Sequence, residues 1–476
     1  MTETPPPAPE APRSFETQHE GRFHDTLVPY RAIAAETHVP GPDGKPWASI
    51  FSFSYLADAP DPERRPVTFI FNGGPGSASL WLHMGAFGPR RLIVPSDATH
   101  AGTAPYTVED NALCLLDKTD LVFIDPPGTG FSKMLPPAKP EDGWGLTVDA
   151  QIVAGFIRTW LTAHKRWSSP RHLWGESYGT TRAVAVAGEL AAGLSGVAFN
   201  SLGLISAILD FHTARFQAGN PLPDVCFLPT YAATALHHGA ITPPPPNKAE
   251  FLAEVRQFAT AEYLPALFAG ARLDLATRSR VRRKLARYTG LSETWLERTR
   301  LRIDAARFRR ELLRDRGATV GRLDSRYLGT EYDQVGEYPE GDPAGSMVDS
   351  AFVSAMNDHM TRQLGIDWGR PYQVFNRDAL TKWDWYGKPT GAPTWPGYVN
   401  VAPTLGRLLR EQANLKVLIA NGYLDIATPF FAVESTISGN GIDSTRIQMT
   451  YYEAGHMMYL HQDSYEALVT DMRALL

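Results

Sequence analysis

The fold of this chain is decided by the stretch Gly175-Glu176-Ser177-Tyr178-Gly179. This G-x-S-x-G pattern is typical of a sharp turn from a strand into a helix, which lifts a serine hydroxyl above the end of a sheet. The two glycines suit such a turn because larger side chains at their positions would obstruct it. Residues 171–174 can form the strand before the turn, and the Ala-rich residues 180–190 can form the helix after it. The pentad alone is equally compatible with an ordinary strand-to-helix turn, so at this point Ser177 is only a candidate nucleophile.

Three continuous apolar runs predict buried parallel strands in the rest of the chain. They cover residues 67–71, 121–124 and 415–420, and Gly or Pro bounds each of them, as expected of strands covered on both faces. Residues 47–56 mix apolar and polar side chains near period two and predict a strand that opens the sheet, and residues 447–452 predict a last strand. Each buried run leads into a polar loop that contains glycine, and α/β sheets build their sites from such loops. The pattern predicts an α/β fold of the α/β-hydrolase type with a mostly parallel central sheet.

The segment 209–345 differs in composition from its surroundings. It holds a proline run at 243–246, followed by charged helical patterns at 278–287 and 297–316 that are rich in arginine. Asp and Glu are interspersed at helical spacing in this arginine-rich region, which favours a solvated helix surface over a face for nucleic acid. We therefore predict a helical cap inserted into the core, after which residues 397–411 form a helix leading back to the sheet. The predicted organisation is a disordered Pro-rich tail at 1–14, a first part of the core at 15–208, the cap at 209–345 and a second part of the core at 346–476.

The composition is that of a soluble globular protein, with 43% hydrophobic and 20% charged residues. The formal net charge of -5 is small for 476 residues, so we expect neither nucleic acid nor a membrane as a partner. No apolar run approaches the ~18 residues of a membrane-spanning helix. The two cysteines, Cys114 and Cys226, predict buried thiols rather than a disulfide framework. The acidic, proline-rich start shows no secretory signal, which predicts a cytoplasmic protein.

A serine nucleophile requires a base, and the base requires a carboxylate that holds it in one tautomer. In α/β-hydrolases these partners follow the serine in the order Asp, then His, each on a loop after a strand. Asp425 follows the run 415–420 and His456 follows the run 447–452, so the chain supplies that order. Taken alone, Asp425 could cap a helix and His456 could be a structural histidine. Their order and loop positions together favour a catalytic pair.

The reaction also requires two backbone amides directed at the developing oxyanion. One is expected from Tyr178, the residue after the nucleophile. The loop at Gly73-Gly74 can supply the other because its backbone can approach the site unobstructed, although a structural turn remains an alternative.

Four blocks of sequence together resemble the serine carboxypeptidases, an α/β-hydrolase family that removes C-terminal residues from peptides. The blocks are Asn72-Gly73-Gly74-Pro75-Gly76, Gly175-Glu176-Ser177-Tyr178-Gly179, the Asp425 loop and Ala454-Gly455-His456-Met457. The resemblance implies Ser177 as nucleophile, His456 as base and Asp425 as the residue that orients the base, with the amides of Gly74 and Tyr178 as oxyanion hole. It also implies that Asn72, Gly73 and Glu176 bind the substrate, and that Asn72 and Glu176 recognise its free carboxylate, with Glu176 protonated for that purpose.

The chain departs from the family pattern at several positions. Ala86 stands where the family has a glutamate that pairs with the one beside the nucleophile, so half of the carboxylate-recognition device is missing. Ser77 replaces a cysteine, Ile70 replaces a tryptophan, and the block at 125–132 is one residue shorter than usual. With Ala86 in this place, we hypothesise that His83 or Arg90 binds the substrate carboxylate by charge.

The sequence thus predicts a serine-type carboxypeptidase that cleaves peptides with a free C-terminus through an acyl-enzyme on Ser177. No metal or organic cofactor is implied. Two alternatives stay open, namely a related acyltransferase or esterase, and a catalytically silent binding protein. The oligomeric state and the side-chain preference at the cleaved bond are open as well.

Overall fold

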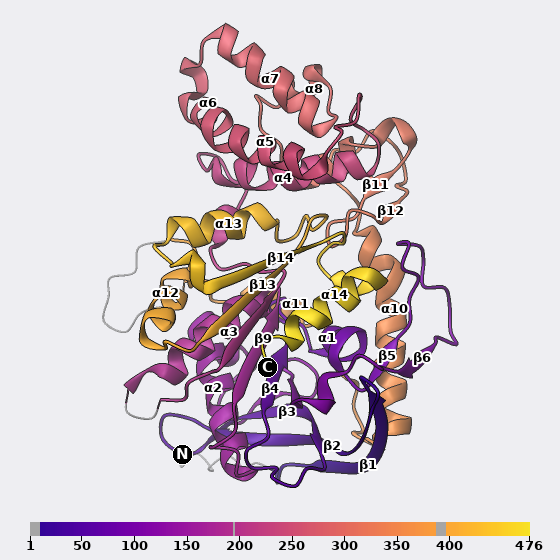
Figure 1. Cartoon of the computed structure of the whole chain (residues 1–476), viewed down its shortest axis with the longest axis vertical. Helices are drawn as coiled ribbons and strands as arrows, with labels where there is room; N and C mark the ends of the chain where they lie inside the picture. The colour runs from indigo at the N-terminus through magenta and orange to yellow at the C-terminus, as the bar shows by residue number, and fades with distance from the viewer. Residues whose placement is uncertain (1–9, 194–195, 387–396) are drawn as a thin grey trace, which may run out of the picture.

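A computed structural model describes residues 10–193, 196–386 and 397–476. Its centre is one large twisted sheet (Figure 1). The strand order is β1-β2-β3-β7-β4-β9-β10-β13-β14, and the short β8 pairs with β3. The strands are β1 (Ser14–Phe23), β2 (Thr26–Pro40), β3 (Pro46–Ala57), β4 (Val67–Phe71), β7 (Asp120–Ile124), β8 (Lys133–Met134), β9 (Arg171–Glu176), β10 (Ser201–Ile205), β13 (Lys416–Gly422) and β14 (Ile447–Tyr452).

The sheet is antiparallel at one edge and parallel from β7 to β14. β1, β2, β3 and β7 pair antiparallel in turn, whereas β7, β4, β9, β10, β13 and β14 pair parallel. The predicted strands at 47–56, 67–71, 121–124, 415–420 and 447–452 are all present in this sheet, with bounds that shift by at most two residues. The prediction of a mostly parallel α/β sheet is confirmed. The long hairpin of β1 and β2 was not predicted.

Helices cover both faces of the sheet, which explains why the central parallel strands are rich in buried apolar residues. One buried cluster joins the sheet to α2 (Leu146–Ala163), α3 (Tyr178–Ala191), α12 (Ala402–Glu411) and α13 (Phe430–Gly439). A second cluster joins the opposite face to α1 (Leu80–Leu82), α10 (Pro343–Asp358) and α14 (Gln462–Arg473). These two groups of helices lie on opposite sides of the strands in Figure 1. Parallel strands between two such layers place their carboxyl-end loops together at one edge.

A separate layer of helices lies beyond α13, at the top of Figure 1. It consists of α4 (Leu222–His237), α5 (Lys248–Phe258), α6 (Leu264–Ala269), α7 (Leu275–Thr289), α8 (Glu293–Arg298) and α9 (Ala305–Glu311). These helices share their own apolar cluster, which also includes Leu424, Ile426 and Phe430 of the core. The predicted cap at 209–345 contains all six helices, and it rests on the loop that follows β13.

Two predicted helices differ from the structure. Residues 297–316 do not form one helix, because Arg300 and Leu301 take left-handed backbone angles after α8 and the side chain of Asp304 caps the start of α9. The helix predicted at 397–411 begins only at Ala402. The stretch before it pairs with the segment after β10 instead, where the amide of Val401 donates to the carbonyl of Leu209 at 2.8 Å.

The N-terminal boundary was also predicted too late. Residues 1–9 of the predicted tail lie outside the described residues, but Arg13 is fixed on the core. Its Nη1 donates to the carbonyl of Trp368 at 3.1 Å, and its guanidinium stacks 4.6 Å from the centre of that ring. β1 then begins at Ser14.

The remaining short elements are the hairpin of β5 (Arg90–Leu92) and β6 (Val108–Asp110), the pair β11 (Thr319–Val320) and β12 (Leu328–Gly329), and α11 (Arg377–Lys382). Cys114 and Cys226 are both buried free thiols, as predicted. No helix in the described ranges combines the length and the apolar character needed to cross a membrane.

Candidate active site

Ser177 sits on the turn between β9 and α3 with φ 62° and ψ -131°. A non-glycine residue in this region is strained by about 1–3 kcal/mol, and such strain persists only where the surroundings fix the backbone. Here both flanking glycines are needed, since a Cβ on Gly175 would lie 2.2 Å from the carbonyl oxygen of Gly179, and one on Gly179 would lie 2.9 Å from that of Phe71. The amide of Ser177 donates to the carbonyl of Ile205 at 3.0 Å, which ties the turn to the neighbouring strand β10. The predicted elbow geometry is present.

His456 and Asp425 form a buried pair on the loops that follow β14 and β13. His456 Nδ1 lies 2.8 Å from Asp425 Oδ2, and the two side chains are 5% and 0% exposed. Asp425 Oδ1 accepts from the amides of Ala427 and Thr428 at 2.7 and 2.9 Å. The carboxylate is therefore fixed by backbone donors, as a capping residue would be, while its other oxygen faces the imidazole. Because Nδ1 of His456 carries the proton of this hydrogen bond, Nε2 is free to accept another proton.

The pKa of His456 is set by two opposing effects. Burial lowers it, but the nearby charges of Asp425 and Glu176, together with the hydrogen bond that Nδ1 donates to Asp425, outweigh burial and hold the pKa above its ordinary value. A charged imidazole is thus stabilised at this position, as the base of an acyl-transfer reaction would require.

Glu176, directly before Ser177, is a buried carboxyl group whose pKa burial raises to about 7, with the charge of His456 opposing that rise. Its Oε1 accepts from Nδ2 of Asn72 at 3.0 Å. Its Oε2 has no hydrogen-bond partner among the described residues, and the hydroxyl of Tyr459 lies beside it but outside hydrogen-bonding geometry. A buried carboxyl group with one free oxygen is suited to donate a proton to an incoming acceptor.

The loop after β4 lies against the elbow, as the oxyanion hypothesis requires. A Cβ on Gly73 would lie 2.5 Å from the amide nitrogen of Tyr178, so only glycine fits this contact. Gly74 has φ +99°, which again favours glycine. The side chain of Asn72 fixes the loop, because its Oδ1 accepts from the amide of Leu82 at 3.1 Å while its Nδ2 bonds Glu176.

A cavity of about 550 Å³ opens between the elbow and the cap. It brings together six of the predicted residues, which are Asn72, Gly73, Gly74, Glu176, Ser177 and His456. Its remaining wall is largely apolar and includes Trp81, Leu323, Val353, Val374, Phe375, Leu380 and Met457. Asp425 lies behind His456 rather than in this wall, consistent with a role through the histidine.

One segment at this site was not predicted from the sequence. Residues 322–324, from the end of the cap, run between the two loops that carry Asp425 and His456. The amide of His456 donates to the carbonyl of Leu323 at 2.6 Å, and the amide of Ile426 donates to that of Arg322 at 3.0 Å. Arg322 itself is exposed and lines the cavity, and no carboxylate of the described residues forms an ion pair with it. No local pattern points to this arrangement, because Arg322 belongs to an arginine-rich region that we interpreted as solvated surface.

The hypothesis that His83 or Arg90 binds the substrate carboxylate is wrong. His83 is buried in a π-helical turn (His83–Phe87), where Nε2 bonds the hydroxyl of Tyr55 at 2.6 Å and burial holds its pKa well below the ordinary value. It is therefore neutral and out of reach. Arg90 pairs with Asp110 at 2.6 Å, and neither His83 nor Arg90 lines the cavity.

The described ranges contain no cluster of three His, Cys, Asp or Glu side chains that could hold a metal ion.

Comparisons with known proteins identify the family pattern and the fold. Residues 47–205 match the sequence profile of the serine carboxypeptidase family, which confirms the resemblance inferred from the motifs. The solved structure of the prohormone-processing carboxypeptidase Kex1(delta)p from Saccharomyces cerevisiae aligns with 93% of this chain and 91% of its own, at a TM-score of 0.57 and 16% identity. The epoxide hydrolase of Aspergillus niger aligns with 93% of this chain and 78% of its own, at a TM-score of 0.35 and 12% identity. No curated protein sequence matches the chain significantly. The fold is that of the α/β-hydrolases, and family segment and fold together indicate a hydrolase of the serine carboxypeptidase type.

Proposed function

We propose that this chain, whose residues 47–205 carry the serine carboxypeptidase family pattern, is a serine-type carboxypeptidase acting on peptides with a free C-terminus. The observation that carries the proposal is the 2.8 Å contact between His456 Nδ1 and Asp425 Oδ2 beside the cavity that Ser177 lines. A base held by a buried carboxylate next to a strained serine is the arrangement that acyl transfer requires.

The proposed reaction has two halves. The Ser177 hydroxyl attacks the terminal peptide carbonyl while Nε2 of His456 takes its proton, and the amides of Gly74 and Tyr178 bind the resulting oxyanion. His456 then gives the proton to the leaving amine, which releases the C-terminal amino acid and leaves an acyl-enzyme. Water, deprotonated by the same imidazole, attacks the ester and restores Ser177.

We further propose that the carboxylate of the substrate binds at Asn72, Gly73 and the protonated Glu176, with Arg322, which lines the same cavity, supplying positive charge. Glu176 with a pKa of about 7 is a proton donor below neutral pH, when a peptide carboxylate is an acceptor. Arg322 takes the part that the sequence hypothesis gave to His83 or Arg90, because it is a cation that reaches the cavity without an ion-pair partner among the described residues.

The test compares a peptide with a free C-terminus against the same peptide as its C-terminal amide, with end products identified by mass spectrometry. A carboxypeptidase releases the last amino acid from the acid and cleaves the amide at least about tenfold more slowly, and Ser177→Ala abolishes the reaction. Transfer of the acyl group to an added amine or alcohol in preference to water would favour the acyltransferase alternative. Failure of the folded wild-type protein to react with a fluorophosphonate would favour a silent binding protein.

A further inference from the structure

Arg182 is a fully buried charge in the second turn of α3, directly behind the elbow. Its Nε lies 2.7 Å from Oδ2 of Asp149 on α2, and both side chains are 0% exposed. The pair is not optimal for stability, because Oδ1 of Asp149 and one Nη of Arg182 are buried without a partner in the described part of the chain. Burial also raises the pKa of Asp149 above its ordinary value although Arg182 opposes that rise. A buried ion pair with unsatisfied atoms is weak evidence for a stabilising role.

The second contact of Arg182 leads to the oxyanion loop. Its Nη1 donates to the carbonyl oxygen of Asn72 at 2.6 Å, a short charge-assisted bond to the residue directly before Gly73 and Gly74. The guanidinium carbon also lies 5.1 Å from the ring centre of Tyr178, whose amide is the other predicted oxyanion donor. One rigid side chain therefore contacts both segments from which the two amides come.

We propose that Arg182, held by Asp149, is a positioning residue that fixes the two oxyanion amides relative to each other, an inference that rests on the proposed acyl-transfer function. A planar guanidinium suits this task because its fork donates to the carboxylate and to the carbonyl at once and cannot lose its proton. Small displacements of oxyanion donors lower the rate strongly, since the amides act only where charge develops in the transition state.

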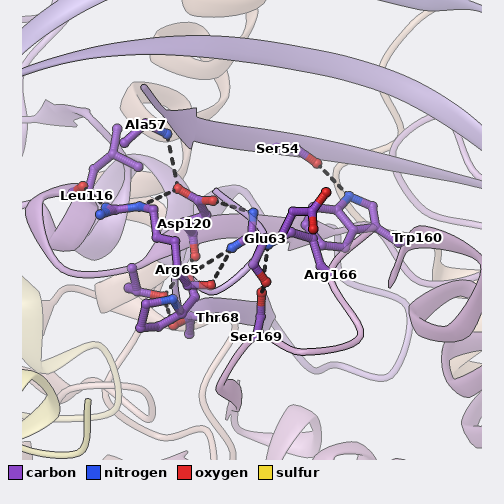
Figure 2. Close-up of polar contacts among 12 residues, drawn as sticks. Ser54, Ala57, Glu63, Arg65, Thr68, Leu116, Asp120, Trp160, Arg166 and Ser169 are labelled. Carbon is purple, nitrogen blue, oxygen red and sulfur yellow. Dashed lines mark hydrogen bonds and ion pairs between the residues drawn. The ribbon is translucent and has the colours of Figure 1, made fainter. Parts of the chain in front are cut away.

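A second buried arginine offers a matched control (Figure 2). Arg166 pairs with Asp120 at 2.6 Å, with side chains 4% and 1% exposed, and Arg65 adds a second bond to Asp120 at 2.8 Å. This cluster lies at the start of β4 and β7, the end of the parallel strands opposite to the elbow, and Arg166 also donates to the carbonyl of Pro66. Loss of Arg166 is expected to disturb packing in the same way as loss of Arg182, but away from the oxyanion amides.

The experiment compares an N-acyl amino acid ester with its thiono analogue, in which sulfur replaces the carbonyl oxygen. Sulfur is a weak hydrogen-bond acceptor, so the thiono ester gains little from the amides. Arg182→Met is expected to lower kcat for the ordinary ester about 10²-fold with little change in KM, and to lower the thiono rate by less than about threefold. Arg166→Met is expected to change neither rate by more than about threefold. Rates are expressed per active serine, counted with a fluorophosphonate.

Equal losses on both esters in Arg182→Met, or an ordinary-ester rate within about threefold of wild type, would overturn the inference. If Arg182→Met does not fold, the double variant Arg182→Met/Asp149→Leu removes the unpaired buried charge and is judged by the same two rates. Arg182→Lys, which keeps the charge opposite Asp149 but not the fork, is expected to show a smaller selective loss on the ordinary ester. A folded wild-type protein that hydrolyses neither ester refutes the proposed function itself.

Discussion

Glu176→Gln tests how the site recognises a free carboxylate. The buried carboxyl has a pKa of about 7 against an ordinary 4.5, which corresponds to about 3 kcal/mol between its two protonation states. Below pH 7 the proton is present and can be donated to the substrate carboxylate; above pH 7 two negative charges would meet. Wild-type kcat/KM on a peptide acid is therefore expected to fall about tenfold per pH unit above an apparent pKa near 7. This fall is the alkaline limb of the pH profile. A glutamine donates through its amide at any pH, so kcat/KM of the variant is expected not to fall in this way.

The same substitution has a stability signature with a defined sign. A carboxyl whose pKa is higher in the folded than in the unfolded chain stabilises the fold fully below pH 4.5 and loses that contribution as the pH rises through 7. Compared with wild type, Glu176→Gln should therefore gain about 3 kcal/mol in free energy of unfolding between pH 4 and pH 8.5. Urea unfolding at the two pH values measures this difference.

Asp125→Asn is the matched control for both measurements. Burial raises the pKa of Asp125 to about 7 as well, and the residue is fully buried, but it bonds Ser79 and Tyr372 and does not line the cavity. It should reproduce the stability change and keep the alkaline limb. An alkaline limb that persists in Glu176→Gln, or that appears for wild type with the peptide amide, would refute the role given to Glu176. On the acid side, activity is expected to rise as His456 loses its proton, with an apparent pKa above the ordinary histidine value that belongs to the coupled pair of groups.

Three further predictions concern single residues of the site. Ser177→Gly should abolish activity and raise Tm, because glycine adopts φ 62° without the strain of about 1–3 kcal/mol; calorimetry showing a lower Tm would contradict the strained elbow. Arg322→Ala should raise KM for a peptide acid about tenfold and leave KM for the peptide amide unchanged. The control is Arg90→Ala, which removes a cation outside the cavity and should change neither KM. Equal effects of Arg322→Ala on both substrates would exclude contact with the carboxylate. Gly73→Ala should abolish esterase activity in a folded protein, since its Cβ would lie 2.5 Å from the amide nitrogen of Tyr178. A circular dichroism spectrum checks that the variant is folded. Retained activity would exclude the loop from the oxyanion hole.

The parts of the fold that could be predicted from the sequence are those that depend on local patterns of residues. The run 67–71 coincides with β4 because a strand buried on both faces consists mainly of apolar residues, here with Thr68 as the exception. The loops after β4, β9, β13 and β14 could then be assigned from glycine, serine, aspartate and histidine alone, since the topology of such a sheet brings them to one edge. β1 was missed because its residues alternate between exposed and partly buried and are mostly polar, so its stability comes from pairing with β2 rather than from its own composition.

The parts that could not be predicted depend on contacts distant in sequence. Nothing local distinguishes Arg182 from the other arginines of a helical pattern, yet its partners Asp149 and Asn72 come from another helix and another loop. The same is true of Leu323, whose carbonyl holds the amide of His456 across more than a hundred residues. The hypothesis for His83 failed because the turn before it directs the imidazole toward Tyr55 and away from the cavity.

The alanine at position 86 affects the protonation of Glu176, the carboxyl group proposed to bind the substrate carboxylate. In the family that this chain resembles, two carboxyl groups share this task, whereas Ala86 is fully buried and its carbonyl accepts from Asn111 at 2.9 Å and from Tyr465 at 3.1 Å. The ring of Tyr459 lies against the neighbouring Gly85, so aromatic side chains surround this position. Glu176 therefore has no carboxyl group at residue 86 to share a proton with, and after burial the charge of His456 has the largest effect on its pKa. Because His456 favours the ionised form of Glu176 and Glu176 favours the charged form of His456, we expect the two groups to titrate as a coupled pair and the pH dependence of the proposed activity to follow that pair.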